Sequence, residues 1–163
     1  LRMAFPNTVV ASIASGIPGE IAFDAPTTVI TAAVNTATAA NNQFGRAFTY
    51  ADSSVETVQA GGTGVFAGIA VNPKAHGYAN LGDAEALLRN GNVGEFLQEG
   101  EVKVELLAGQ TGVIGADVYF VNATGEIGVG TAATGQTQIN GGTIARHNIS
   151  TGNPQLAVIR IKP

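Results

Sequence analysis

The sequence is poor in ionic groups. Only 12% of its 163 residues are Asp, Glu, Lys or Arg, whereas typical soluble domains carry roughly 25%. Thr, Asn, Gln and Gly fill the polar positions instead, and the mean hydropathy is +0.20. Because surface charge protects a protein against association, this composition favours a subunit whose surface is largely covered by neighbouring chains.

Cysteine is absent, which excludes disulfides, a thiolate nucleophile and a thiolate metal site. No apolar run approaches the ~20 residues that a membrane-spanning helix needs, and candidates such as Val29–Val34 are interrupted by Thr. The N-terminal residues show no basic region followed by an apolar stretch, so we expect no signal peptide. The sequence predicts no association with a membrane.

Basic residues are few and scattered. The chain has 8 Lys and Arg against 12 Asp and Glu, which gives a formal net charge of −4. Binding of nucleic acid usually requires clustered cations that displace counterions from phosphates. We therefore expect no direct contact with nucleic acid.

Groups that could perform catalysis are also scarce. His76 and His147 are the only histidines, and tryptophan is absent. Two isolated histidines without cysteine make a zinc site improbable, and the loose carboxylate pairs lack the aromatic residues that hold sugars in glycosidases. We expect no enzyme activity and no catalytic, cofactor-binding or metal-binding residues. A small hydrolase using His147 with a nearby Ser or carboxylate stays as an alternative.

Short β-branched runs separated by glycines predict an all-β fold, a small β-barrel or jelly-roll-like sandwich. Turns are expected at Gly61–Gly64, Gly109–Gly112, Thr124–Gly125 and Gly141–Gly142, and a long hairpin loop at Ala32–Asn42. The expected strands are Thr27–Val34, Arg46–Tyr50, Val65–Val71, Val102–Leu107, Val118–Asn122, Glu126–Val129, Thr143–His147 and Leu156–Ile161.

Alternation is clearest in the segment Glu101–Leu106, which places charged side chains on one face and aliphatic ones on the other. Glu101 and Glu105 are thus expected on a solvated or partner-facing edge. The same pattern near the C-terminus directs Arg160 outward. One segment, Asp83–Arg89, has the helix formers and charge order of at most one short helix.

The first residues differ from the rest, with small residues, prolines and no alternation. Their apolar groups favour an extended N-terminal arm over residues 1–23 that orders on a neighbouring subunit, while residues 24–163 form a single domain. The expected partner-binding residues of this arm are Phe5, Pro6, Val9, Val10, Ile13 and Ile17.

Three stretches in order, Gly64–Pro73, Glu95–Leu106 and Gly115–Gly125, followed by Leu156–Ile161, carry a family resemblance. Together they resemble the structural cement, or capsid decoration, proteins of tailed bacteriophages, over roughly residues 5 to 161. Glu-Phe-Leu-Gln-Glu-Gly-Glu-Val is the distinctive motif, and Ala116 is a minor departure within one turn.

The resemblance implies a small β-barrel body that forms a dimer or trimer. It implies a place in the virion, on the outer surface of an icosahedral head assembled in the host cytoplasm, where the protein clamps neighbouring major capsid subunits. The family offers no catalytic residues to transfer. The alternative is a secreted or surface-displayed β-sandwich binding module, pilus-like or carbohydrate-binding, which the Thr- and Gly-rich strands would also fit.

Overall fold

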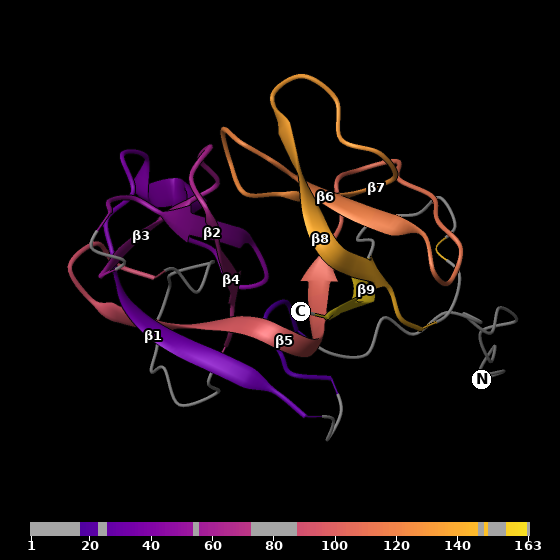
Figure 1. Cartoon of the computed structure of the whole chain (residues 1–163), viewed down its shortest axis with the longest axis horizontal. Helices are drawn as coiled ribbons and strands as arrows, with labels where there is room; N and C mark the ends of the chain where they lie inside the picture. Colours follow the sequence, from indigo (N-terminus) through magenta and orange to yellow (C-terminus); the bar gives the residue numbers. More distant parts are fainter. Residues whose placement is uncertain are drawn as a thin grey trace, which may run out of the picture.

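The computed structural model describes residues 17–22, 26–53, 56–72, 88–146, 149 and 156–162. These residues form an all-β body, which confirms the predicted fold class (Figure 1). Its elements are β1 (Thr28–Val34), the 3₁₀ turn η1 (Ala39–Asn41), β2 (Ala47–Tyr50), β3 (Thr57–Ala60), β4 (Phe66–Ala70), β5 (Val93–Glu105), β6 (Asp117–Val121), β7 (Ile127–Val129), β8 (Gln136–Ile144) and β9 (Leu156–Ile161).

Five strands close into a barrel. Their order is β1-β3-β2-β4-β5, and β5 returns to pair with β1. The closing contact is antiparallel and continuous from Ala33 opposite Val93 to Thr28 opposite Glu99, with a bulge after Thr28. On the other side of β1 only Ala33 and Val34 pair with β3, in parallel. The barrel is therefore closed firmly along β5 and only briefly along β3.

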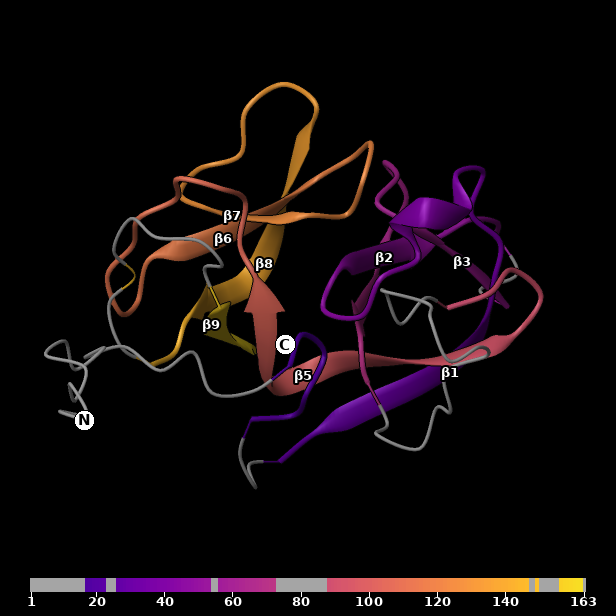
Figure 2. The same cartoon turned by 180° about the vertical axis from the view of Figure 1, so that it is seen from behind.

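The same long strand begins a second unit, the rolled sheet, with the order β5-β9-β8-β6-β7. A bridge between Leu106 and Ile127 brings its two ends together. The barrel and the rolled sheet lie side by side, with β5 running beneath the barrel and then bending up into the rolled sheet (Figures 1 and 2). β5 pairs with β1 and β4 in its first half and with β9 in its second half.

Two hydrophobic clusters fill the molecule. The barrel core contains Phe48 and Phe96, whose ring centroids lie 4.9 Å apart. The second cluster fills the rolled sheet and also takes in Leu97 and Ile69 from the outer face of the barrel wall. Because Phe96 and Leu97 are neighbours on β5 and point to opposite sides, both faces of this strand are buried.

The last part of the predicted arm lies against the body. Residues 19–22 run antiparallel to β5, in line with β1, and Ile21 lies opposite Val102. The amide of Lys103 donates to Glu20 and the amide of Ala22 donates to Glu101, both at 2.9 Å. The body thus includes these residues of the segment that the sequence assigned to the arm.

Several predictions of the secondary structure are wrong in detail. Gly141–Gly142 is not a turn but lies within β8, where Gly141 adopts a φ of +71°. Ala32–Asn42 is not one hairpin loop, because Ala32 belongs to β1 and the chain then forms η1. Strand β3 and the first half of β5 were not predicted. The predicted helix lies largely outside the described residues.

Two glycine turns let the barrel and the rolled sheet touch through their backbones. The amide of Gly62 donates to the carbonyl of Asn122 at 2.6 Å, and the amide of Ala47 donates to the carbonyl of Gly125 at 2.8 Å. A Cβ atom added to Gly125 would lie 2.5 Å from the carbonyl oxygen of Ala47. A side chain here would force the two units apart.

Gly125→Ala is expected to lower the free energy of unfolding by about 3 kcal/mol or more, since left-handed strain and overpacking add. Gly109→Ala is the matched control, because Gly109 has a φ of +78° against +76° at Gly125, with no atom within 4 Å of an added Cβ. The control should cost only the conformational strain, roughly 1–2 kcal/mol. Urea denaturation measures both, and equal losses would contradict the contact.

Candidate binding surface

A set of loops at one end of both units forms a continuous surface, which we call the loop face. It comprises residues 35–41, 61–65, 122–125 and 130–136. Asn122 is its centre: its carbonyl accepts from the amide of Gly62 at 2.6 Å, and its amide donates to the carbonyl of Gly135 at 2.9 Å. Asn41 donates from its side chain to the carbonyl of Ala123 at 3.1 Å. The loop face is therefore held in one shape by bonds between barrel and rolled sheet.

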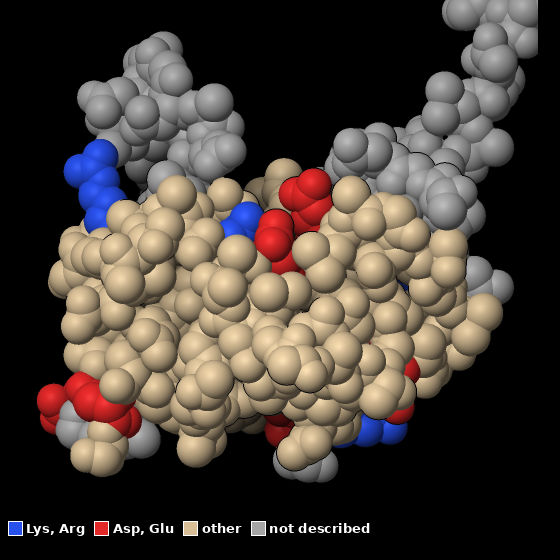
Figure 3. Space-filling model, turned by 90° about the horizontal axis from the view of Figure 1, so that it is seen from above, with Lys and Arg blue, Asp and Glu red and all other residues tan. Residues whose placement is uncertain are grey.

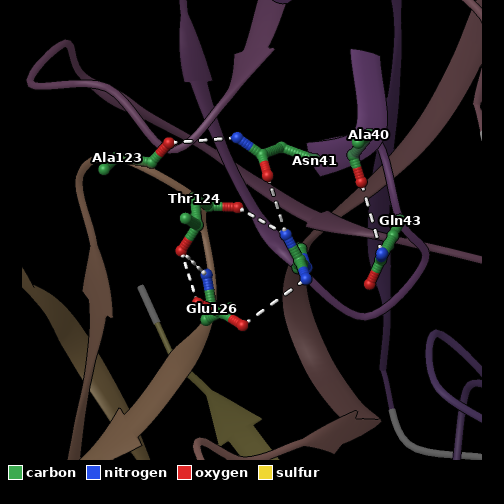
Figure 4. A network of polar contacts seen from close by, with 7 residues as sticks. Ala40, Asn41, Gln43, Ala123, Thr124 and Glu126 are labelled. Atoms are coloured by element: carbon green, nitrogen blue, oxygen red, sulfur yellow. Dashed lines mark hydrogen bonds and ion pairs between the residues drawn. The ribbon is translucent and has the colours of Figure 1, made fainter. Parts of the chain in front are cut away.

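An ion pair lies beside the loop face and connects its two halves (Figure 4). Arg46, next to β2, donates to Asn41 and to the carbonyl of Thr124, both at 3.2 Å, and lies 3.5 Å from the carboxylate of Glu126. Thr124 in turn donates to Glu126 at 2.7 Å. One guanidinium thus joins η1 in the barrel to the turn between β6 and β7.

The loop face itself carries no charge. None of the residues in its four ranges is Asp, Glu, Lys or Arg, whereas about 25–35% of a typical soluble surface is charged. Ala39, Ala40, Thr63 and Ala123 are exposed, and Val65 is 74% exposed. Viewed from this end, most of the surface is uncharged, with charged atoms at its margins and in one group in the upper central part of the view (Figure 3). Such a surface loses little hydration when a partner covers it.

The predicted exposure of Glu101 is wrong. Glu101 lies on the outward side of β5 but is only 2% exposed, because two arginines cover it. Arg160, directly opposite on β9, donates from Nε at 2.8 Å and makes a second, shorter contact through Nη2. Arg146, just after β8, donates from Nε at 3.1 Å. The alternation identified the face of the strand but not the cations that bury it.

This cluster keeps Glu101 ionised. Burial raises the pKa of Glu101, but hydrogen bonds from Arg160 and Arg146, with their positive charges, lower it more, so the net pKa lies below its ordinary value of 4.5. The three side chains connect β5, β9 and the end of β8. Glu101 therefore contributes to stability, whereas Glu105 is exposed to solvent, as expected.

Of the six expected partner-binding residues only Ile17 lies within the described residues, where it is 44% exposed. Phe5, Pro6, Val9, Val10 and Ile13 lie outside them, as does His147. The residues of the loop face were not singled out from the sequence. A signal was present in the uncharged composition of the four turns, but nothing in the sequence showed that they meet.

No cluster of three potential metal ligands occurs among the described residues. A search of the same residues finds no helix with the length and apolar character of a membrane span.

The fused barrel and rolled sheet, with an uncharged face across both, are features of a structural β protein that binds other chains. The chain belongs to the structural cement proteins of phages, a family described by gp24 of E217 and gp6 of Pam3, which it matches over residues 5–162. It is thus a structural component of the virion capsid, and the resemblance inferred from the sequence is confirmed. No curated protein matches the chain.

A solved structure, the capsid of Myoviridae phage XM1, contains a chain with the same fold. The TM-score is 0.68 and the sequence identity 18%, and the alignment covers 98% of each chain. The likeness extends over both the barrel and the rolled sheet, which supports their description as one architecture.

Glu101→Gln is expected to lower the free energy of unfolding by about 2 kcal/mol, because both arginines lose a charged acceptor but can turn to solvent. Glu105→Gln, four residues along the same strand and exposed, should change stability by less than ~0.5 kcal/mol. Thermal and urea unfolding at neutral pH test the difference. A Glu101→Gln protein as stable as the control would show that the cluster contributes nothing.

The lowered pKa of Glu101 also determines how the stability of the protein changes at acidic pH. A carboxylate whose pKa is lower in the folded state stabilises the fold above its unfolded pKa, and this contribution disappears as the pH falls through the folded pKa. The wild-type protein should therefore lose its advantage over Glu101→Gln as the pH falls below about 4.5. Unfolding curves of both proteins across that range test this, and a constant difference would contradict it.

Proposed function

We propose that this protein binds the outer surface of an icosahedral phage head and clamps neighbouring major capsid subunits, with the loop face against the shell. The observation that carries the proposal is the charge-free loop face, which extends over both units. Family membership supports the role in the capsid, and the choice of surface rests on the loop face.

A docking surface for a rigid shell should need little rearrangement. The loop face meets this requirement, because backbone bonds from Asn122 to Gly62 and Gly135 fix its loops before binding. Preorganised surfaces avoid much of the entropy cost of ordering side chains and loops. Short Ala, Thr and Gly side chains also have few rotamers to lose.

Clamping requires contact with more than one subunit. The barrel supplies residues 35–41 and 61–65 of the loop face, and the rolled sheet supplies residues 122–125 and 130–136. A copy placed over a boundary can set one unit on each side of it. The second contact then forms at high effective concentration, which raises the overall affinity without new kinds of interaction.

The substitution Ala40→Glu places a carboxylate on the exposed turn η1 within the loop face. Burying this unpaired charge against the shell should weaken binding to capsids stripped of the protein at least about 100-fold. Ala108→Glu makes the same change at another exposed alanine, in the turn after β5 outside the loop face. This control should bind as the wild type does.

Co-sedimentation with stripped capsids measures the affinity, and electron microscopy of the decorated particles shows the side of the shell that is occupied. Unaltered binding of Ala40→Glu would exclude the loop face as the docking surface. Density inside the shell would exclude the outer location.

A further inference from the structure

The barrel has an open edge on β1. The amide of Val34 donates to the carbonyl of Asn92, which shows that Val34 directs its polar backbone groups towards β5. Because these groups alternate along an antiparallel strand, those of Ile30 and Ala32 also point to β5. Those of Val29, Thr31 and Ala33 point away from it.

Strand β3 uses only the far end of this edge. The amide of Ala33 donates to the carbonyl of Glu56 at 3.0 Å, and the parallel pairing begins at the same residue. In the part of the chain that the structure describes, no hydrogen bond reaches the outward N–H and C=O groups of Val29 and Thr31. Both residues are exposed.

The exposed part of β1 has no side chain that protects an edge strand. Natural edges carry lysine or proline within the exposed run, whereas residues 27–31 read Thr-Thr-Val-Ile-Thr, and the bulge after Thr28 precedes the free groups of Val29 and Thr31. Four of these five residues are exposed and Ile30 is half-buried. The edge combines free backbone groups with β-branched, uncharged side chains, which is the surface that an added strand recognises.

We propose that the β1 edge binds, by strand addition, the N-terminal residues 1–16 of a second copy of this chain. This inference concerns self-association and does not depend on the binding of capsids. Residues 8–13, Thr-Val-Val-Ala-Ser-Ile, are uncharged and mostly β-branched, so they match the composition of the edge. Sixteen extended residues reach up to roughly 50 Å, enough to span to a neighbouring copy.

The distribution of charge favours binding of the N-terminal segment to the β1 edge over a contact between the β1 edges of two copies. Arg2 is the only charged residue among residues 1–16, so the rest of the chain is more acidic than the net −4 of the whole. On β5, Glu95 and Glu99 lie opposite Thr31 and Thr28, one strand away from the free edge. Two bodies meeting edge to edge would place the carboxylates of the two copies roughly 14 Å apart, whereas the segment brings a cation.

Geometry favours a segment from another copy. Residues 19–22 run in the same direction as β1 and lie beyond its start, since Ile21 is opposite Val102 and Thr28 is opposite Glu99. Gly19, whose amide donates to the carbonyl of Lys103, therefore lies eight residues along β5 from Glu95, the partner of Thr31. A copy's own segment would have to return along that length of β5 to reach its own free edge, whereas a segment from a neighbouring copy is not constrained in this way.

The absence of cysteine makes a direct test possible. One full-length variant carries Thr31→Cys on the edge, and a second carries Thr8→Cys or Ser12→Cys in the N-terminal segment. Mixed and mildly oxidised, they should form a disulfide-linked heterodimer on a non-reducing gel. Thr63→Cys, an exposed threonine on the loop face, replaces Thr31→Cys in the control mixture and should give little of this product.

Solution mass measurements complete the test. Sedimentation equilibrium should show a self-associated wild-type protein, and both deletion of residues 1–16 and Thr31→Lys should raise its dissociation constant at least about tenfold. Thr63→Lys should leave self-association unchanged. Circular dichroism of each variant confirms that the body is folded.

Each other outcome would overturn the proposal. If Thr31→Lys dissociates the protein but the deletion does not, the occupant is another β1 edge. A monomeric wild type, or a disulfide between the two positions only when one chain carries both cysteines, would exclude exchange between copies. Since no capsid is present, these results are independent of whether the loop face binds the shell.

Discussion

The structure depends on burial of β5 on both of its faces. Phe96 fills the barrel and Leu97 fills the rolled sheet, and each is fully buried. Transfer of each side chain from water contributes about 1.5–3 kcal/mol. The position of the strand between the two units matters more than this free energy. Neither unit is complete without this strand, because it closes the barrel against β1 and provides the first strand of the rolled sheet. The two units consequently form around a common element.

The loop face follows from this arrangement. With the two units fixed side by side by β5, their turns at one end are close enough for direct backbone bonds, and Gly61 and Gly125 permit that approach. Arg46 then binds across the junction to Thr124 and Glu126. The ion pair of this region thus lies beside the loops, with the Glu126 side chain 38% exposed, and the loops themselves carry no charge. Ionic groups are instead placed along β5 and its neighbours, where Glu101 and its two arginines join three strands.

The sequence pattern identified strands in which one face is buried and the other is exposed to solvent. Alternation located the second half of β5 and β9, and β-branched runs between glycines located β1, β2 and β4. It failed in the first half of β5, where Gly94 gives the buried face no apolar side chain and Phe96 and Leu97 are buried in succession. It also failed where a glycine bends a strand, as Gly141 does in β8. The short strand β3 has too few residues to stand out. Glu101 was misplaced because its partners, Arg146 and Arg160, come from positions more than 40 residues away that only the fold brings together.

The passage of one strand through both units determines how the molecule responds to tension. A force that draws the barrel away from the rolled sheet acts along the covalent chain of β5. To yield, one half of the strand must slide lengthwise past β1 or past β9, each of which is paired with it at six positions. Hydrogen bonds loaded in this direction resist together, whereas bonds at a peeled edge break one after another. We therefore expect the protein to resist forces that separate the barrel from the rolled sheet.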